Sequence, residues 1–181
     1  MRWEVLASEV MYRCGIFSVR RDRSRSRNGL THDFHVIEAG DWVNVVPLTT
    51  DRRVVMVRQF RHGIRDLTLE VPAGVVDETD PSPAVAALRE LREETGYVSR
   101  DLVPLGVVHP NPAIMNNRCH MFVALDVEVA GAPQWDGTEE LEVELVELDR
   151  VGELIRSGAV SNALTLVAFQ LLHLMQPPAA T

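Results

Sequence analysis

The run Arg89-Glu-Leu-Arg-Glu-Glu-Thr-Gly96 combines helical periodicity with a dense cluster of carboxylates. Glu90, Glu93 and Glu94 are spaced i, i+3 and i+4, so an α-helix places all three side chains on one face. Like charges one turn apart cost roughly 0.2–0.5 kcal/mol per pair on an exposed helix. Two interpretations follow: a solvated acidic face that neighbouring arginines partly neutralise, or a site where a divalent cation binds between the carboxylates.

Residues on either side of this run predict the limits of the helix and its surroundings. Ser82 is the expected N-cap, Pro83 the first helical residue and Gly96 the stop. A glycine-containing loop at Gly74 leads into the helix, so hard oxygen ligands gather at a coil-to-helix junction, which favours a metal site. The apolar side of the helix, which predicts packing on a core, consists of Ala84, Val85, Ala87, Leu88 and Leu91.

Gly74 and the run Arg89–Tyr97 together resemble the signature box of the Nudix hydrolases, G-x5-E-x7-R-E-U-x-E-E-x-G-U, where U is an aliphatic or aromatic residue. Every position from Arg89 to Tyr97 matches. The interval from Gly74 to Arg89 is one position longer than the pattern, and the upstream Glu of the box is absent. We interpret the difference as one additional loop residue, with Asp80 in place of that Glu.

The resemblance implies a divalent-metal site, because in this family the box glutamates and the carbonyl before the box glycine bind the ions. The implied metal ligands are Ala73, Glu90, Glu93 and Glu94. Mg2+ is the expected cofactor, with Mn2+ as a substitute. Glu93 is expected to bind or bridge a second ion and to take part in catalysis. Arg89 is expected to support catalysis by orienting the carboxylates through ion pairs.

An acidic loop, Trp135-Asp-Gly-Thr-Glu139-Glu140, precedes a predicted strand. In the resembling enzymes a loop at this place supplies an additional metal ligand or the base that activates water. Its distance from the first apolar residue of the strand favours Glu139 as this catalytic carboxylate, with Glu140 as the second choice. A loop that is merely acidic is the alternative. Trp135 either stacks on a base or caps the loop.

Four residues are predicted to bind substrate: Arg58, Arg61, Pro112 and Arg118. The guanidinium groups of Arg58 and Arg61 suit a diphosphate, and the equivalent segment lies beside the substrate in the resembling enzymes. Surface ion pairs explain each of these two arginines equally well. Pro112 and Arg118 belong to a polar loop of the kind that reads substrate. A proline at this place is a marker of the ADP-ribose pyrophosphatase-like branch of the family.

The strand and helix pattern predicts an α/β (α+β) fold: a Nudix-type mixed β-sheet core sandwiched between helices, preceded by an N-terminal antiparallel β-meander. The meander strands are expected at 3–10, 14–25 and 32–39. We expect residues 1–40, the N-terminal sheet, and 41–181, the catalytic core, to form a single structural domain overall. The core strands are expected at 42–48, 54–60, 67–71, 102–109, 119–127 and 141–148, and two closing helices at 151–157 and 163–175.

An arginine series from Arg20 to Arg27 runs through the predicted meander. It marks either a solvated strand face or a surface that faces phosphate or a second subunit. In the ADP-ribose and nucleotide-sugar branch a similar N-terminal sheet often packs across a dimer. The resemblance in layout therefore implies a homodimer.

Composition excludes several classes of protein. The 181 residues carry a formal net charge of -8, which argues against a nucleic-acid or membrane-surface binder. All 18 basic residues are arginines, so lysine Schiff-base chemistry is excluded. Cys14 and Cys119 give neither a disulfide framework nor metal-ligand spacing. No apolar run approaches the ~20 residues of a membrane span. These features predict a cytoplasmic protein.

The sequence therefore predicts Mg2+-dependent hydrolysis of the pyrophosphate bond of a nucleoside diphosphate sugar. ADP-ribose would give AMP and ribose 5-phosphate, and a GDP-sugar such as GDP-mannose would give GMP and the sugar 1-phosphate. One alternative is a Nudix-like module that senses a nucleotide sugar without cleaving it; the three retained box glutamates weigh against it. Another is a housecleaning NTP or RNA-cap pyrophosphohydrolase, against which the N-terminal extension, Pro112 and the acidic charge weigh.

Overall fold

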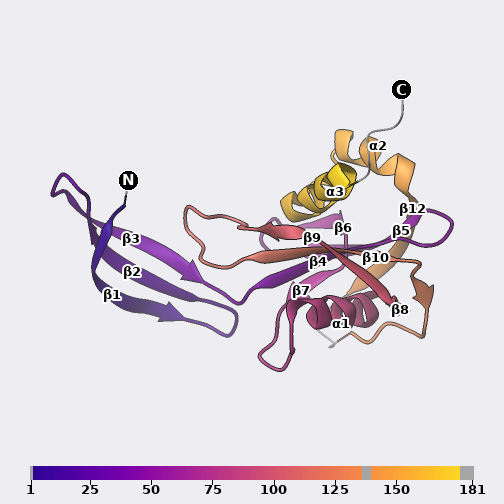
Figure 1. Ribbon diagram of the computed structural model, residues 1–181, viewed down its shortest axis with the longest axis horizontal. Helices are drawn as coiled ribbons and strands as arrows, with labels where there is room; N and C mark the ends of the chain where they lie inside the picture. The colour runs from indigo at the N-terminus through magenta and orange to yellow at the C-terminus, as the bar shows by residue number, and fades with distance from the viewer. Residues whose placement is uncertain (1, 136–139, 176–181) are drawn as a thin grey trace. The chain divides into compact units, whose positions relative to one another are not determined.

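The computed structural model describes residues 2–135 and 140–175, and the chain divides into two compact units (Figure 1). One unit comprises Met1–Asp41 and His109–Arg118, and the other comprises Trp42–Val108 and Cys119–Thr181. A loop between two core strands is thus part of the N-terminal unit, which the sequence did not indicate. That the chain is a single structural domain overall stays a prediction.

The N-terminal unit is a three-stranded antiparallel meander in the order β1-β2-β3, as predicted. β1 spans Glu4–Arg13, β2 spans Ser18–Arg25 and β3 spans Thr31–Glu38. The hairpin between β2 and β3 turns at Gly29, whose φ of 85° is left-handed backbone that glycine adopts without strain. Every residue of β1 is exposed.

The arginines of the meander form ion pairs between its strands. Arg21 in β2 contacts Glu9 in β1 at 2.7 Å, and Arg25 contacts Glu4 at 2.8 Å. Both pairs stand directly opposite each other in the β1–β2 register. Arg20 is also ion-paired within the sheet. Opposite charges at facing positions stabilise a sheet, so these arginines have a structural role in the meander.

The core unit contains a mixed four-stranded sheet in the order β7-β4-β10-β9. Its two central strands, β4 and β10, are parallel, and the outer strands pair with them in antiparallel fashion. Each central strand is a β-branched and apolar run, as expected for a strand covered on both faces. The bounds are Trp42–Pro47 for β4, Ala73–Val75 for β7, Asp101–Val108 for β9 and Cys119–Leu125 for β10.

A second, antiparallel sheet has the order β12-β5-β6, and a short pair joins β8 to β11. The second sheet comprises Arg53–Arg61 in β5, Asp66–Glu70 in β6 and Leu141–Glu147 in β12. The short pair comprises Tyr97–Val98 in β8 and Glu128–Val129 in β11. The sequence did not predict β7, β8 or β11, because two or three residues are too few to establish a period.

Helices cover both faces of the core strands (Figure 1). Helix α1 (Pro83–Thr95) packs on one face, and α3 (Ala163–Met175) packs on the other. Alternate residues of β5 show the division, since Val55 packs with α1 while Val54 and Met56 pack with α3. A 3-10 turn, η1 (Leu148–Arg150), leads into the short helix α2 (Val151–Arg156).

The predicted fold class is therefore confirmed: a mixed α+β core between helices, preceded by an antiparallel meander. β10 ends two residues before its predicted limit, at a turn where Asp126 has a φ of 48°.

Within the described ranges, every helix is too short or too polar to cross a lipid bilayer.

Candidate active site

Helix α1 begins and ends where the sequence predicts. The Ser82 side chain accepts a hydrogen bond from the Val85 amide at 3.3 Å, and Pro83 occupies the first turn. Gly96 adopts a φ of 74° and its amide donates to the Arg92 carbonyl at 2.8 Å. The helix is fixed at both ends, which holds the three box glutamates in a constant register.

Glu94 is a buried carboxylate held against the end of the preceding sheet. Glu94 is only 3% exposed, and its Oε2 atom accepts a hydrogen bond from the Ala73 amide at 3.1 Å. Ala73 is the residue whose carbonyl the family resemblance implies as a metal ligand. The structure thus brings together two of the four predicted ligands, one from α1 and one from β7.

Glu90 lies directly over Gly74. A Cβ atom added to Gly74 would stand 2.1 Å from both Cδ and Oε1 of Glu90, far inside van der Waals contact. The absence of a side chain at this position is therefore what allows the carboxylate to approach the backbone of β7. This gives the glycine of the box a steric reason.

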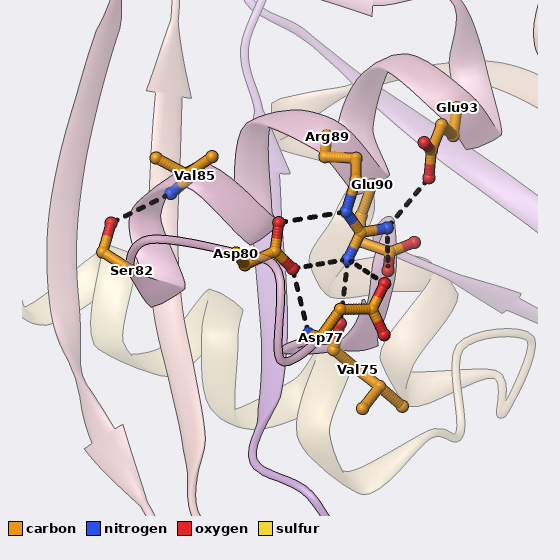
Figure 2. A network of polar contacts seen from close by, with 8 residues as sticks. All are labelled: Val75, Asp77, Asp80, Ser82, Val85, Arg89, Glu90 and Glu93. Carbon is orange, nitrogen blue, oxygen red and sulfur yellow. Dashed lines mark hydrogen bonds and ion pairs between the residues drawn. The ribbon is translucent and has the colours of Figure 1, made fainter.

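Arg89 is the centre of a network of carboxylates (Figure 2). Its Nη1 donates to Glu90 at 2.8 Å and to Glu93 at 2.9 Å, and its Nη2 donates to Asp80 at 2.9 Å and to the Val75 carbonyl at 3.0 Å. The hydrogen bond with Asp80, supported by those with the glutamates, raises the pKa of Arg89 against the effect of burial. Arg89 therefore stays charged and orients both glutamates.

Asp80 closes the loop between β7 and α1. Besides contacting Arg89 with both carboxylate oxygens, it accepts a hydrogen bond from the Asp77 amide at 2.9 Å. The hydrogen bonds from Arg89 lower the pKa of the Asp80 carboxyl. This geometry matches the interpretation that Asp80 stands in place of the missing box Glu and that the additional residue is accommodated in the loop.

The donor set of the site suits a hard divalent cation. Three carboxylates belong to one helix, and one of them, that of Glu94, accepts a hydrogen bond from the amide at the start of β7; carboxylate oxygens are ligands of the type that Mg2+ and Mn2+ prefer. Within residues 2–135 and 140–175, however, no three Asp, Glu, His or Cys side chains converge on one point. Arg89 supplies positive charge between Glu90 and Glu93.

A pocket of about 740 Å3 borders Ala73 and Gly74. One wall carries Phe60 and His62, whose rings meet edge to face at 5.1 Å. Polar groups of β4, β5, β6 and the segment before α3 also line the pocket: Asn44, Arg61, Thr68, Glu70, Ser161 and Asn162. The combination of an aromatic wall with convergent hydrogen-bonding groups is typical of a small-molecule site.

Glu70 is a buried charge in the wall of this pocket. It is 1% exposed and accepts two hydrogen bonds from Arg61, at 2.9 and 2.7 Å, and another from Thr68. Burial alone would raise the pKa of the Glu70 carboxyl, but the hydrogen bonds from Arg61 and Thr68 outweigh burial and lower it. The Asn162 side chain, which caps the start of α3 by accepting from the Thr165 amide at 3.0 Å, also contributes to this lowering.

The lowered pKa predicts acid-sensitive stability. Glu70 stabilises the fold above its unfolded pKa of about 4.3, and this contribution is lost as the pH falls through the lower folded pKa. Glu70→Gln should therefore reduce the free energy of unfolding by about 1–3 kcal/mol at about pH 7, and the difference should narrow towards about pH 3. Urea denaturation across this range measures it, with Glu147→Gln at an exposed position of β12 as control. A pH-independent difference would contradict the assignment.

Two of the three arginines predicted to bind substrate, Arg58 and Arg61, form ion pairs within the core unit. Arg61 lines the large pocket and is held by Glu70 as described. Arg58 in β5 forms a diagonal ion pair with Glu144 in β12, and it lines a separate cleft of about 280 Å3 with Trp135 and Glu140. Both side chains thus form an ion pair, which was the alternative to substrate binding in the sequence analysis. Of the two, only Arg61 lines the 740 Å3 pocket.

The acidic loop is described only at its ends. Glu139 lies outside the described residues, and Glu140 is exposed. The indole nitrogen of Trp135 donates to the Glu94 carbonyl at 3.1 Å. This contact with α1 is neither of the two roles that the sequence left open for Trp135, stacking on a base or capping the loop, and both stay predictions.

Pro112 and Arg118 belong to the N-terminal unit. There, Arg118 forms two hydrogen bonds with Asp41, at 2.8 and 3.0 Å, and the neighbouring Asn117 donates to the Gly40 carbonyl at 3.1 Å. Pro112 is exposed. The loop that the sequence predicted to read substrate thus uses its polar groups to bind the segment that follows β3.

Two functional contacts escaped the sequence analysis. The capping of α3 by Asn162 had a visible signal, since Ser161-Asn162 precedes the apolar run of the helix. The hydrogen bond from Trp135 to α1 had none, because it joins residues that are distant in the sequence.

Comparison with known proteins agrees with this geometry. The family model described as "NUDIX domain" matches residues 40–166. The chain is 31% identical over 150 residues to an ADP-ribose pyrophosphatase of Bacillus subtilis, covering 82% of this chain and 80% of the relative. It is 30% identical over 163 residues to a GDP-mannose pyrophosphatase of Salmonella typhimurium, covering 82% of this chain and 84% of the relative. A crystal structure of an ADP compounds hydrolase has the same fold, with a TM-score of 0.84, 23% identity and coverage of 96% and 93%.

The chain therefore belongs to the Nudix family and is a hydrolase that acts on pyrophosphate bonds. Within the family it falls in the ADP-ribose pyrophosphatase-like branch, as Pro112 and the layout of the N-terminal sheet indicated.

Proposed function

We propose that this Nudix hydrolase cleaves the pyrophosphate bond of a nucleoside diphosphate sugar in a Mg2+-dependent reaction, with ADP-ribose and GDP-mannose as the leading substrates. The observation that carries the proposal is the juxtaposition of Glu90 and Glu94 with Ala73 and Gly74 at the border of the 740 Å3 pocket. The names of the two relatives, one an ADP-ribose and one a GDP-mannose pyrophosphatase, support this choice of substrates.

Glu90, Glu93 and Glu94 and the Ala73 carbonyl would hold the ions, with Mn2+ able to substitute. Bound Mg2+ would offset the pyrophosphate charge and lower the pKa of water. Arg89 orients Glu90 and Glu93, and its charge-assisted bonds to Asp80 keep it in place when the glutamates turn towards an ion. Glu139, with Glu140 as second choice, is the proposed carboxylate that takes the proton from water.

Substrate recognition is proposed to use Arg61 in the large pocket, with Arg58 beside the acidic loop and Pro112 and Arg118 in the N-terminal unit. Arg61 is charged and can be reached by a ligand in the pocket, because its side chain is 41% exposed even though it is ion-paired with Glu70. Such a held guanidinium is preorganised to donate to a diphosphate or a sugar hydroxyl without losing further side-chain freedom.

A substrate panel tests the proposal. Purified protein with Mg2+ should convert ADP-ribose to AMP and ribose 5-phosphate, or GDP-mannose to GMP and mannose 1-phosphate, with the products identified by chromatography. UDP-glucose, diadenosine polyphosphates, NTPs and capped RNA complete the panel. Cleavage restricted to NTPs or caps would overturn the substrate class. Binding of a nucleotide sugar with no cleavage would restore the sensor alternative.

A homodimer built through the N-terminal meander is a further part of the proposal. The open edge strand β1 bears many exposed apolar side chains, and such edges and patches favour association. They include Val5, Leu6, Val10, Met11 and Tyr12. Light scattering should give twice the mass of the chain, and a monomeric mass would contradict the homodimer.

The cytoplasm is the proposed location, in keeping with two free cysteines, and cell fractionation tests it.

A further inference from the structure

The segment 130–135 supplies hydrogen-bond donors to the C-terminal end of α1. The amide of Gln134 donates to the Glu93 carbonyl at 2.8 Å, and the indole nitrogen of Trp135 donates to the Glu94 carbonyl at 3.1 Å. The last carbonyls of a helix have no donors within the helix itself. This segment, which we name the cap segment, therefore satisfies acceptors that would otherwise depend on solvent.

The two capped carbonyls belong to Glu93 and Glu94, which are also proposed to hold the metal ions. Glu94 is thereby held at both of its ends: its side chain accepts from the Ala73 amide, and its carbonyl accepts from Trp135. Helix ends fray when their terminal groups lack partners. Loss of a donor here would let the last turn of α1 move relative to β7, and with it the distance between the box carboxylates and the Ala73 carbonyl.

Trp135 is the side-chain member of this cap and can be changed without altering the backbone. The residue is 43% exposed, so its ring contributes less to the core than a buried tryptophan would. Trp135→Phe keeps an aromatic ring at the same place, but it removes the N–H donor together with the five-membered ring of the indole. The same substitution at another half-exposed tryptophan, Trp3, therefore serves to measure the effect of the lost ring area.

We infer that Trp135 is a positioning residue for the metal site: its indole N–H holds the last turn of α1 so that Glu93 and Glu94 remain aligned with Ala73. The inference rests on the proposed metal-dependent function. Trp135 does not itself contact the ions, and its effect reaches them through the backbone of their ligands.

Calorimetric titration of the purified full-length protein with Mn2+, without substrate, tests the inference. One hydrogen bond contributes about 0.5–1.5 kcal/mol, so Trp135→Phe should weaken ion binding roughly three- to tenfold. At saturating metal its KM for substrate should equal that of the wild type, whereas the metal concentration needed for half-maximal turnover should rise by the same factor. Trp3→Phe is the matched control, because Trp3 is 44% exposed and lies in the N-terminal meander unit.

The outcomes separate this inference from the proposed function. If the wild type binds Mn2+ and Trp135→Phe binds it equally tightly, the inference is wrong and the function stands. If the wild type binds no divalent ion, the proposed function itself fails. Should Trp135→Phe not fold, the double variant Trp3→Phe/Trp42→Phe supplies the test by fluorescence. Trp135 is then the remaining tryptophan of the chain, and an indole bonded to the backbone of a metal ligand should change its emission on ion binding. Unchanged emission at saturating Mn2+ would overturn the inference.

Discussion

Glu94→Gln should lower turnover at least about a hundredfold while the melting temperature stays within a few degrees of the wild type. The hydrogen bond from the Ala73 amide reaches a side-chain oxygen that glutamine also possesses, so the buried contact survives the substitution. What disappears is the negative charge that a divalent cation requires from its ligand. The prediction thus separates the chemical role of Glu94 from its role in packing.

Steady-state turnover of ADP-ribose or GDP-mannose and a thermal melt together measure this effect. Glu128→Gln, in the exposed strand β11, is the control that removes one carboxylate without touching α1. A fully active Glu94→Gln protein would refute the assignment of Glu94 as a metal ligand. A large fall in melting temperature would instead show that the charge serves the fold.

Gly74→Ala should also abolish most activity, by about a hundredfold, for a steric rather than an electrostatic reason. The new methyl group would overlap the Glu90 carboxylate, and the flexible end of that side chain can move away at little cost to stability. The backbone at Gly74 is not left-handed, so the alanine introduces no strain of its own. The fold should therefore persist while Glu90 is displaced from β7.

Gly15→Ala provides the matched control, since a Cβ at Gly15 meets nothing within 4 Å and its φ is not positive either. Metal titration and turnover should distinguish the two variants, and melting temperatures should not. Wild-type metal affinity in Gly74→Ala would show that the close approach of Glu90 has no part in binding the ion.

The limits of α1, Pro83–Thr95, were predicted to the residue because local chemistry determines them. Ser82, Pro83 and Gly96 each influence only the nearest turn of the helix, and each is found in its expected role. The long core strands were predicted to within one or two residues at each end, since each contains enough apolar and β-branched residues to establish its period. Box residues were recognisable because their spacing is itself the signal.

Contacts between distant segments were not predictable in the same way. Arg58 and Arg61 carry the charge suited to a diphosphate, yet their ion pairs depend on the pairing of β5 with β12 and β6, which brings Glu144 and Glu70 within reach. Arg118 was interpreted as a substrate ligand because it ends a polar loop, and only the fold reveals Asp41 as its partner. The charge of a side chain can be read from the sequence, but the residue with which it pairs is determined by the topology of the fold.

The network around Arg89 has a consequence for how the protein folds before it binds a metal ion. Because Arg89 supplies a counter-charge among the carboxylates of α1, we expect the chain to fold without a bound ion, in contrast to small zinc proteins. Under the proposed metal-dependent mechanism, the folded protein would then take up its ions after synthesis. A chelator should abolish its activity without unfolding it, and added magnesium should restore the activity.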